Sequence, residues 1–335
     1  MTISDHDQSK PIRWGILGTG WIAGDFAAAL QITPGAVLAA VGSRSLESAQ
    51  AFGRKFQIET CYGSYQELAD AKDVDAIYIA TPHPLHAANA MMALHGGKAV
   101  LCEKPFTMNR HEAVPVVGLA HAKGLFLMEA MWSRFLPSLS EIKRIMASGE
   151  IGKVHHLSAD FGFRATSDPT HRVHNMALGG GALLDIGIYP LSLAAYLMGP
   201  IQAAQAQAEL GSTGTDLQTT FTLRHQTGGV SVGSCSLVAH TPNELTVSGE
   251  LGYVRMHAPF HHSQTLSVVL HDGSTRSIDT PSLGNGYAHE AIEVMRCMRA
   301  GLIESPEMSH AETLTLMGWL DTMRGQIGLR YPADR

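Results

Sequence analysis

Short apolar runs alternate with amphipathic helical patterns over the first 131 residues of the chain. Uninterrupted apolar runs are typical of parallel strands that are buried on both faces. Ser64 with Glu67, and Asn109 with Glu112, have the spacing of capping boxes at helix starts. The alternation predicts an open, doubly wound parallel sheet with right-handed crossovers. The expected strands lie within residues 14–17, 36–44, 60–63, 75–82, 98–105 and 125–132.

The pattern changes after a helix expected at residues 135–152. In the segments that follow, many positions alternate with a period of two or are β-branched, and Gly and Asp mark the turns. A buried helical segment at 183–190 interrupts them, and two helices at about 286–301 and 309–328 close the chain. The pattern predicts an α+β domain with a large, mostly antiparallel open sheet. Its strands are expected within residues 153–163, 202–210, 217–225, 228–240, 244–258 and 265–279.

The length of 335 residues corresponds to about two domains, at roughly 150 residues each. We expect an α/β protein with a dinucleotide-binding Rossmann domain at 1–131 and a substrate-binding α+β domain at 132–335. Hydrophobic residues make up 45% of the chain and charged residues 16%, as in globular proteins. The net charge is −6 and no Lys/Arg block is present, so nucleic acid and anionic membranes are not expected as partners.

Targeting and metal-binding signals are weak in this sequence. No apolar run reaches the roughly 18 residues of a membrane span, and the polar start MTISDHDQSKP has no apolar signal core. We therefore expect a cytoplasmic protein. The four cysteines form no C-x-x-C pair, and the 18 histidines are read as loop or surface residues. No metal site is expected, because such a site needs three or four converging ligands.

The turn after the first strand has the pattern G-x-G-x-x-A, in the sequence GTGWIA. Gly18 permits a tight turn, Gly20 lets a pyrophosphate approach the backbone, and Ala23 lets helix and strand pack closely. The amides at the helix start, at Trp21 and Ile22, then face the phosphates. The strand before the turn and the helix after it favour dinucleotide binding over an ordinary glycine turn.

The end of the second strand reads Gly-Ser-Arg-Ser and carries no acid. NAD-binding units place an acid there to bond the ribose hydroxyl, whereas a hydroxyl and a guanidinium suit a 2′-phosphate. Ser43 and Arg44 therefore favour NADP as the cofactor, and NAD is less favoured. The alternative for Arg44 is a solvated loop charge.

Two later strand ends are also expected at the cofactor, because ligands lie across the carboxyl ends of parallel strands. Thr81 and Pro82 end one of these strands. Glu103 and Lys104, in the tripeptide Glu-Lys-Pro, end the next. The following proline restricts the lysine. A strand terminus with a solvated lysine is the alternative.

Further candidates lie in MWSRF, at the exit from the last strand of the first domain, and near two other strand ends. Trp132 and Phe161 are candidate apolar walls for a ring or the face of a sugar. Arg134 and His86 are candidate contacts to the cofactor or the substrate. Packing at a hinge between the domains is the alternative for MWSRF.

The segment LLDIGIYP, residues 183–190, carries an acid and a phenol within a buried helical pattern. Asp185 and Tyr189 are four residues apart, which places them on one helical face. Because a carboxylate in an apolar helix needs a partner, the two are either a satisfied structural pair or reacting groups. The glycines at 179–181 are expected to let substrate and nicotinamide approach the helix start.

With Glu-Lys-Pro and GGGALLDIGIYP in place, the sequence resembles the Gfo/Idh/MocA oxidoreductase family. The likeness runs from RWGILGTG through YGSYQEL, KAVLCEKPF and GLFLMEAMWSRFLP to GGGALLDIGIYPL and covers nearly the whole chain. It is closest to the branch of dimeric dihydrodiol dehydrogenases and NADP-dependent D-xylose dehydrogenases. The resemblance implies a Rossmann domain, a mixed α/β domain whose open sheet face forms a homodimer, and hydride transfer at a carbinol or carbonyl carbon.

The resemblance also implies roles for single residues. Lys104 matches the lysine of the family's E-K-P motif, and Asp185 and Tyr189 match the acid and the tyrosine of its D-x-G-x-Y motif. In this branch the tyrosine is the acid/base and the lysine tunes it. Arg44 matches the first phosphate-binding arginine, whereas the second falls near Ser48, where this sequence has no arginine.

Residues and resemblance together predict an NADP-dependent dehydrogenase or reductase that acts on CH–OH groups. Free tyrosine has a pKa of about 10, and a nearby ammonium lowers it, so Lys104 would make Tyr189 a better acid/base at neutral pH. Asp185 is expected to face the lysine or the substrate, which would be a sugar such as D-xylose, a trans-diol or a small dicarbonyl. Two alternatives are an NADP-sensing regulator of the same fold and an aldose–aldose oxidoreductase with a tightly bound cofactor.

Overall fold

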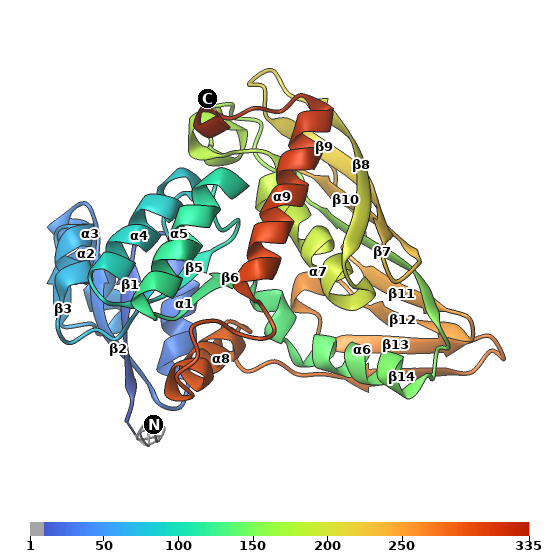
Figure 1. The fold of residues 1–335 in the computed structure, drawn as a ribbon, viewed down its shortest axis with the longest axis horizontal. Helices are drawn as coiled ribbons and strands as arrows, with labels where there is room; N and C mark the ends of the chain where they lie inside the picture. The colour runs from blue at the N-terminus through green and yellow to red at the C-terminus, as the bar shows by residue number, and fades with distance from the viewer. Residues whose placement is uncertain (1–9, 335) are drawn as a thin grey trace. The chain divides into compact units, whose positions relative to one another are not determined.

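The computed structural model describes residues 10–334, which fold into two compact units (Figure 1). Among these residues, the first unit consists of 10–132 and Leu283–Thr315, and the second of Ser133–Ser282 and 316–334. The chain passes from one unit to the other three times, after residues 132, 282 and 315. The domain boundary expected at 131/132 lies one residue before the first of these points. The polar start on which the signal-core argument rests lies largely outside the described residues.

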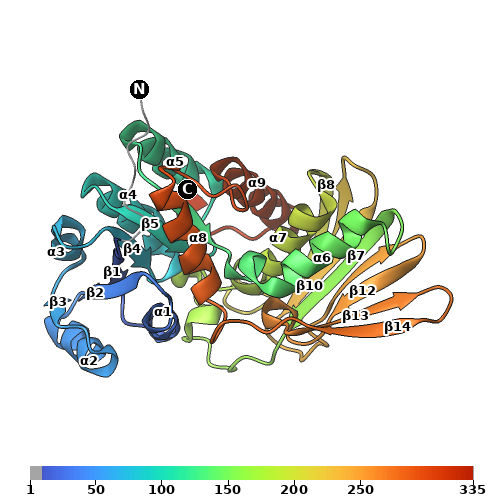
Figure 2. The ribbon, with the colours of Figure 1, turned by 90° about the horizontal axis from the view of Figure 1, so that it is seen from below.

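The first unit contains a parallel sheet in the order β3-β2-β1-β4-β5-β6, which confirms the predicted doubly wound sheet. Its strands are β1 Ile12–Leu17, β2 Ala36–Gly42, β3 Thr60–Tyr62, β4 Ala76–Ile79, β5 Ala99–Glu103 and β6 Leu127–Ala130. Its helices are α1 Trp21–Gln31, α2 Leu46–Phe56, α3 Tyr65–Asp70, α4 His86–His95, α5 Arg110–Lys123 and α8 Ala288–Arg299. Contacts join α1 to α2 and α8, and α4 to α3 and α5, so two groups of helices flank the sheet (Figure 2).

Local sequence signals set the helix starts in this unit. Ser64 Oγ accepts from Glu67 N at 3.2 Å, and Glu67 Oε2 accepts from Ser64 N at 3.1 Å, so the predicted capping box is present. Asn109 Oδ1 likewise accepts from Glu112 N at 2.9 Å. Such caps satisfy amides that the first helical turn leaves without partners.

Residues 283–315 belong to the first unit because they complete its core and its sheet edge. Helix α8 buries Ala288, Ala291 and Val294 against the unit. At the edge of the sheet, Leu127 N of β6 donates to Ile303 O at 2.9 Å. An edge strand exposes unpaired backbone groups, so this late segment covers an edge that the N-terminal residues alone leave open.

The second unit contains a sheet in the order β14-β13-β12-β11-β7-β10-β9-β8. Its neighbours are antiparallel except β7 and β10, which confirms the predicted large, mostly antiparallel sheet. The strands are β7 Val154–Gly162, β8 Ile201–Leu210, β9 Asp216–His225, β10 Val230–Ser236, β11 Leu245–Gly249, β12 Gly252–Met256, β13 Thr265–Leu270 and β14 Thr275–Asp279.

Helices of the second unit gather on one face of this sheet. Helix α7 (Ile188–Met198) packs on β7 and β10, and α6 (Pro137–Ser148) lies on the same face (Figure 2). Helix α9 (His310–Ile327) reaches β8 through Gln326, whose side chain donates to Ala204 O at 2.9 Å and accepts from Ala206 N at 2.8 Å.

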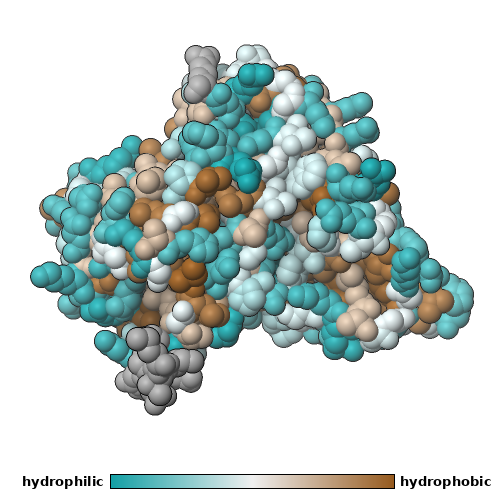
Figure 3. All heavy atoms as spheres, in the orientation of Figure 1, coloured by the Kyte–Doolittle hydropathy of each residue, from teal (hydrophilic) through white to brown (hydrophobic). Residues whose placement is uncertain are grey.

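The longest apolar helical pattern of the described chain is buried, and the surface carries both polar and apolar residues. One helical stretch within residues 10–334, Met176–Met198, is long and apolar enough to cross a membrane, but 89% of its apolar window is buried inside the fold. It is therefore a core helix of the second unit. On the face drawn in Figure 3, hydrophilic and hydrophobic residues are interspersed.

An ion pair joins the start of β1 to the residue before β4. Arg13 Nη2 donates to Asp75 Oδ1 at 2.7 Å, and Arg13 Nε donates to Oδ2 at 3.0 Å. Partial burial raises the pKa of Asp75, but the hydrogen bonds from Arg13 outweigh burial and hold the pKa below its ordinary value. A carboxylate with a lowered folded-state pKa stabilises the fold above its unfolded pKa and loses that contribution as pH falls.

Replacing Arg13 with Ala is expected to lower the free energy of unfolding by about 0.5–1 kcal/mol at neutral pH, since the pair is part-exposed. The difference from the parent should shrink once the pH falls below about 4, where Asp75 takes up its proton. Urea unfolding at pH values on both sides of that point measures this. The control is Arg144→Ala, which breaks an exposed ion pair with Glu141 and should change the free energy of unfolding little. A loss of stability that does not depend on pH would contradict the assignment.

Candidate active site

The glycine turn after β1 provides an open helix start in the first unit. Gly18 has φ +110°, and a Cβ there would lie 2.9 Å from Ala80 O, so the position requires glycine. At Gly20, the residue before α1, a Cβ would have no atom of the described chain within 4 Å apart from Gly20 itself and its chain neighbours. Within the described chain, α1 has no side-chain cap and no acid in its first turn. Its first amides can therefore bind a phosphate, and the turn fits a dinucleotide.

A cavity of about 770 Å³ lies between α1 and α2, next to this turn. Gly20, Trp21 and Ser48 contribute to its wall. Trp21 is 79% exposed. Asp25 and Lys55 also line the cavity, and burial raises the pKa of Asp25 despite the nearby Lys55 charge. The volume lies in the range of about 300–1,000 Å³ that is usual for ligand sites.

The loop after β2 places Ser43 and Arg44 differently. Ser43 is buried, and its backbone N–H donates to Tyr62 O at 3.2 Å. Arg44 is exposed, and its guanidinium has no ion-pair or hydrogen-bond partner within residues 10–334. Arg44 is therefore available to a ligand without breaking a contact inside the protein.

His86 is engaged by the backbone rather than presented to a ligand. Its ring is fully buried, with Nδ1 2.9 Å from Pro105 O and Nε2 2.7 Å from Thr81 O. The expected contact of His86 with cofactor or substrate is not what the structure shows, because both ring nitrogens are occupied. The ring instead joins the loop after β4, which continues into Pro82, to the loop after β5. Thr81 is fixed further by Asn89, whose Nδ2 donates to Thr81 Oγ1 at 3.0 Å.

Buried carboxylates fix the loop on both sides of Lys104. Glu103 accepts a short hydrogen bond from the Tyr78 hydroxyl at Oε1 and one from Lys104 N at Oε2, at 3.1 Å. Glu129 Oε1 accepts from Phe106 N at 3.0 Å. Glu103 was expected to contact the cofactor; in the structure its carboxylate is buried and holds the backbone of the half-buried Lys104.

Helix α8 adds two groups that the sequence did not indicate. Glu290 is fully buried, and neither carboxyl oxygen has a hydrogen-bond partner within residues 10–334. Burial, followed by the charge of Glu103, raises the pKa of Glu290 well above its ordinary value. Tyr287, just before α8, stacks on Trp132 with ring centroids 4.3 Å apart. Trp132 is thus buried within the first unit.

In the second unit, the candidate reacting pair lies on an unusual helix. Asp185 belongs to a π-helical turn, Leu183–Gly187, and α7 with Tyr189 follows directly. The sequence pattern predicts ordinary α-helical spacing here; the wider i→i+5 hydrogen bonding is rare and is frequently found at functional sites. Both side chains are buried.

Asp185 has an arginine partner that the sequence did not predict. Arg172 Nη2 lies 3.4 Å from Asp185 Oδ2, and Arg172 Nη1 lies 3.5 Å from Oδ1. The Arg172 side chain is 57% exposed while that of Asp185 is buried. Arg172 therefore balances the charge of Asp185 from within the same unit.

Aromatic rings surround Tyr189. The ring centroids of Phe161 and Tyr189 are 5.4 Å apart, and those of His261 and Tyr189 are 5.6 Å apart. Phe161 and His261 stack on each other at 4.3 Å. Phe161 thus lies beside Tyr189, as a candidate wall should. The sequence does not indicate His261 as a site residue, because nothing local links it to Tyr189.

Arg134 contacts helix α7. Its side chain is buried, Nε donates to Ser192 Oγ at 2.8 Å, and Nη2 donates to Ser192 O at 2.9 Å. The guanidinium also lies over the Tyr196 ring, 4.9 Å from its centroid. The structure thus gives Arg134 partners on the helix that carries Tyr189, where a cofactor or substrate contact had been expected.

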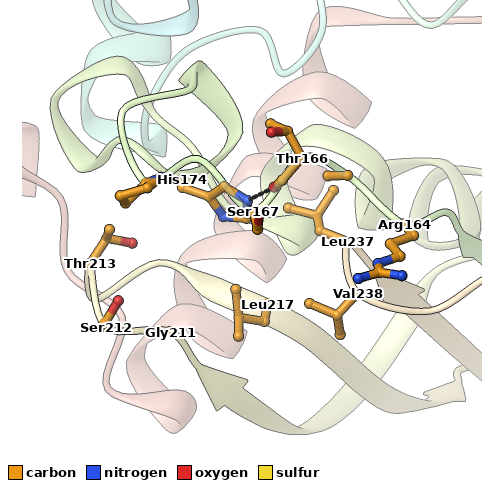
Figure 4. A pocket seen from close by; sticks show the side chains of 12 residues that line it. Arg164, Thr166, Ser167, His174, Gly211, Ser212, Thr213, Leu217, Leu237 and Val238 are labelled. Carbon is orange, nitrogen blue, oxygen red and sulfur yellow. Dashed lines mark hydrogen bonds between the residues drawn. The ribbon is translucent and has the colours of Figure 1, made fainter.

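A second cavity, of about 480 Å³, lies in the second unit at the ends of β7, β9 and β10 (Figure 4). His174 Nε2 lies 2.7 Å from Thr166 O at its side. The cavity combines a guanidinium, hydroxyl groups and an apolar floor, and none of the predicted site residues lines it. The lining residues are Arg164, Ala165, Thr166, Ser167, Pro169, His174, Gly211, Ser212, Thr213, Leu217, Leu237 and Val238.

Both parts of the chain match models of one protein family. Residues 12–131 match the oxidoreductase family with an NAD-binding Rossmann fold, and residues 139–255 match the GFO/IDH/MocA C-terminal domain. The chain belongs to the Gfo/Idh/MocA oxidoreductase family. This confirms the resemblance of the sequence motifs.

Relatives of this Gfo/Idh/MocA protein include two trans-1,2-dihydrobenzene-1,2-diol dehydrogenases. The one from Danio rerio is 36% identical over 334 residues, covering 96% of this chain and 99% of the relative. The one from Mus musculus is 36% identical over 336 residues, covering 97% and 99%. The chain is thus similar over nearly its full length to dehydrogenases that act on CH–OH groups.

Solved structures of two other oxidoreductases have the same fold. KijD10, a 3-ketoreductase from Actinomadura kijaniata in complex with NADP and TDP-benzene, superposes with a TM-score of 0.86 at 25% identity, covering 95% of this chain and 98% of that one. The aldose–aldose oxidoreductase from Caulobacter crescentus gives a TM-score of 0.87 at 25% identity, covering 95% and 97%. This Gfo/Idh/MocA protein is an oxidoreductase with an NAD(P)-binding fold.

Proposed function

We propose that this Gfo/Idh/MocA enzyme is an NADP-dependent dehydrogenase or reductase for a sugar, a trans-diol or a small dicarbonyl. The observation that carries the proposal is the pair Asp185, on the π-helical turn, and Tyr189, at the start of α7 beside the aromatic rings of Phe161 and His261. A carboxylate balanced by Arg172 and a phenol among aromatic rings suit a hydroxylated substrate with an apolar face. The dihydrodiol dehydrogenase relatives support the same class.

In the proposed reaction, Tyr189 is the acid/base. In the oxidation direction its phenolate takes the proton of the substrate hydroxyl as hydride leaves the same carbon, and in reduction its hydroxyl returns that proton. The nicotinamide supplies the hydride acceptor or donor at C4. Asp185 accepts a hydrogen bond from a substrate hydroxyl. Lys104 is assigned to the same reaction from the E-K-P motif, as the ammonium that stabilises the phenolate.

We propose NADP rather than NAD as the cofactor. Arg44 is exposed and has no partner in the described chain, and the end of β2 has no acid for a ribose hydroxyl. A guanidinium is suited to the added phosphate of NADP. The complex of KijD10 with NADP supports this choice, since that enzyme is 25% identical to this chain.

We also propose a cytoplasmic homodimer that forms through the open face of the large sheet. Helices α6 and α7 cover one face, and Figure 2 shows no helix of the described chain on the other face of these strands. Side chains such as Ser158, Thr246 and Arg255 are only partly buried there. The four cysteines are free, which is usual in a reducing compartment.

A substrate panel with both cofactors tests the proposed activity. Aldoses including D-xylose, a trans-diol, and a small dicarbonyl in the reverse direction are offered, and the absorbance of reduced nicotinamide is followed. We expect turnover with NADP for at least one substrate and slower turnover with NAD. Tight NADP binding without turnover of any substrate would contradict the proposal and favour a regulator.

The likeness to the Caulobacter crescentus enzyme gives a second candidate, an aldose–aldose oxidoreductase. Such an enzyme recycles its cofactor between two sugars and retains it. The nicotinamide content of the purified protein separates the two candidates. Retained cofactor, with one aldose converted at the expense of another and no cofactor added, would identify the second activity.

A further inference from the structure

The start of the turn that carries Asp185 is held by a carboxylate from another strand. Asp216, the first residue of β9, accepts from Leu183 N at 2.7 Å through Oδ2. The same oxygen accepts from Thr219 Oγ1 at 2.7 Å. An acceptor at a helix start pairs an amide that the helix leaves free, and negative charge is favoured there. Asp216 therefore acts as the cap of the π-helical turn, from 33 positions along the chain.

A phenol holds the backbone just before that turn. Tyr331 Oη donates to Gly180 O at 2.6 Å, and its side chain is buried. Burial, together with the charge of Asp216, raises the pKa of Tyr331 well above its ordinary value, so the hydroxyl remains a donor at neutral pH. Arg324 lies over the Tyr331 ring at 5.2 Å, and Asp334 pairs with Arg324 at 2.7 Å. Tyr331 is therefore held firmly in the second unit.

The glycine run fits against these groups. Gly181 has φ +125°, and a Cβ there would overlap Asp216 Oδ1 and lie 3.0 Å from Tyr331 Oη. At Gly180 a Cβ would lie 2.6 Å from Arg172 O. The run was expected to admit substrate and nicotinamide; at these two glycines the space is instead taken by protein groups. The glycines let Asp216 and Tyr331 reach the backbone.

We infer that Asp216 and Tyr331 are positioning residues for the reaction, and this inference rests on the proposed function. They fix the backbone on both sides of Gly181, and through it the π-helical turn with Asp185 and the start of α7 with Tyr189. Neither side chain is assigned a part in the proton or hydride transfer. A π-helical turn is rare, so contacts at its start are needed to hold Asp185 and Tyr189 in this arrangement.

Tyr331→Phe is the main test, because it removes one hydroxyl and keeps the ring. We expect kcat per folded molecule to fall by about 3–10-fold, with the Kd for NADP unchanged, since small misplacements of reacting groups cost much of the rate. Asp216→Ala should lower kcat by about 10–100-fold, and Asp216→Asn, which keeps an acceptor oxygen, should restore most of it. The matched control is Ser231→Ala, which removes a buried 2.7 Å hydrogen bond to His225 in the same unit and should leave kcat unchanged.

A double variant separates positioning from general stability. If Tyr331 acts through Tyr189, Tyr331→Phe should cause no further loss of kcat in a Tyr189→Phe background. An unchanged kcat in Tyr331→Phe, or an equal loss in both backgrounds, would overturn the inference and leave the proposed function standing. If Tyr189→Phe itself has no effect, the proposed function fails instead. If the Asp216→Ala variant does not fold, the kcat values of Tyr331→Phe in the two backgrounds still test the positioning role.

Discussion

Replacing Tyr189 with Phe is expected to lower kcat by about 10²–10⁴-fold, the usual contribution of a general acid or base. The substitution removes the hydroxyl only, and the ring keeps its neighbours Phe161 and His261. The Kd for NADP should stay unchanged, because the glycine turn that fits the dinucleotide belongs to the first unit. Steady-state kinetics with the preferred substrate, together with direct cofactor titration, measure both quantities.

Tyr196→Phe is the matched control for this variant. Tyr196 lies on the same helix, α7, and its hydroxyl accepts from Lys143 Nζ at 2.9 Å outside the proposed site. Its loss should leave kcat at the parental value. A kcat for Tyr189→Phe within about tenfold of the parent would assign the acid/base role to another group.

Replacing Arg44 with Ala is expected to raise the Kd for NADP by about 10–100-fold, because hydrogen bonds to charged groups contribute about 1.5–3 kcal/mol. The Kd for NAD should hardly change, since NAD has no 2′-phosphate. The substitution breaks no contact within the described chain, so the fold should be unaffected. Cofactor titrations at low and high salt are the measurement, and the difference between variant and parent should narrow at high salt.

Arg54→Ala controls for the general loss of a positive charge. Arg54 is exposed on the last turn of α2 and lies outside the proposed site. The Arg54→Ala substitution should change the Kd for either cofactor only slightly. If Arg44→Ala raised the Kd values for NADP and NAD equally, the assignment of Arg44 to the 2′-phosphate would be refuted.

Features encoded by neighbouring residues were predictable from the sequence. These features depend on residues only a few positions apart. They include the Ser64–Glu67 capping box, the glycine turn at Gly18 and the change from helical to two-residue periodicity. The alternation of strands and helices then determines the parallel sheet, because crossovers have one hand. The motif around Asp185 and Tyr189 was found in the same way, from its spacing.

Partners that lie far apart in the sequence were not predictable. Asp216 reaches Leu183 across 33 positions and Tyr331 reaches Gly180 across 151. Nothing in the sequence near Arg172 or His261 shows that they approach Asp185 and Tyr189. The surroundings of His86 were not predictable either. A histidine after a strand end suggests a ligand contact, but both ring nitrogens lie within hydrogen-bond distance of carbonyl oxygens, those of Pro105 and Thr81.

The return of residues 283–315 to the first unit has a consequence for the order in which the protein folds. When Trp132 leaves the ribosome, β6 still lacks the backbone partner at Ile303, and Trp132 lacks the ring of Tyr287. At about 5–20 residues per second, the missing segment follows roughly 10–40 s later. During that interval the nascent nucleotide-binding unit exposes a sheet edge and an aromatic side chain. Its final folding step must therefore follow synthesis of most of the second unit.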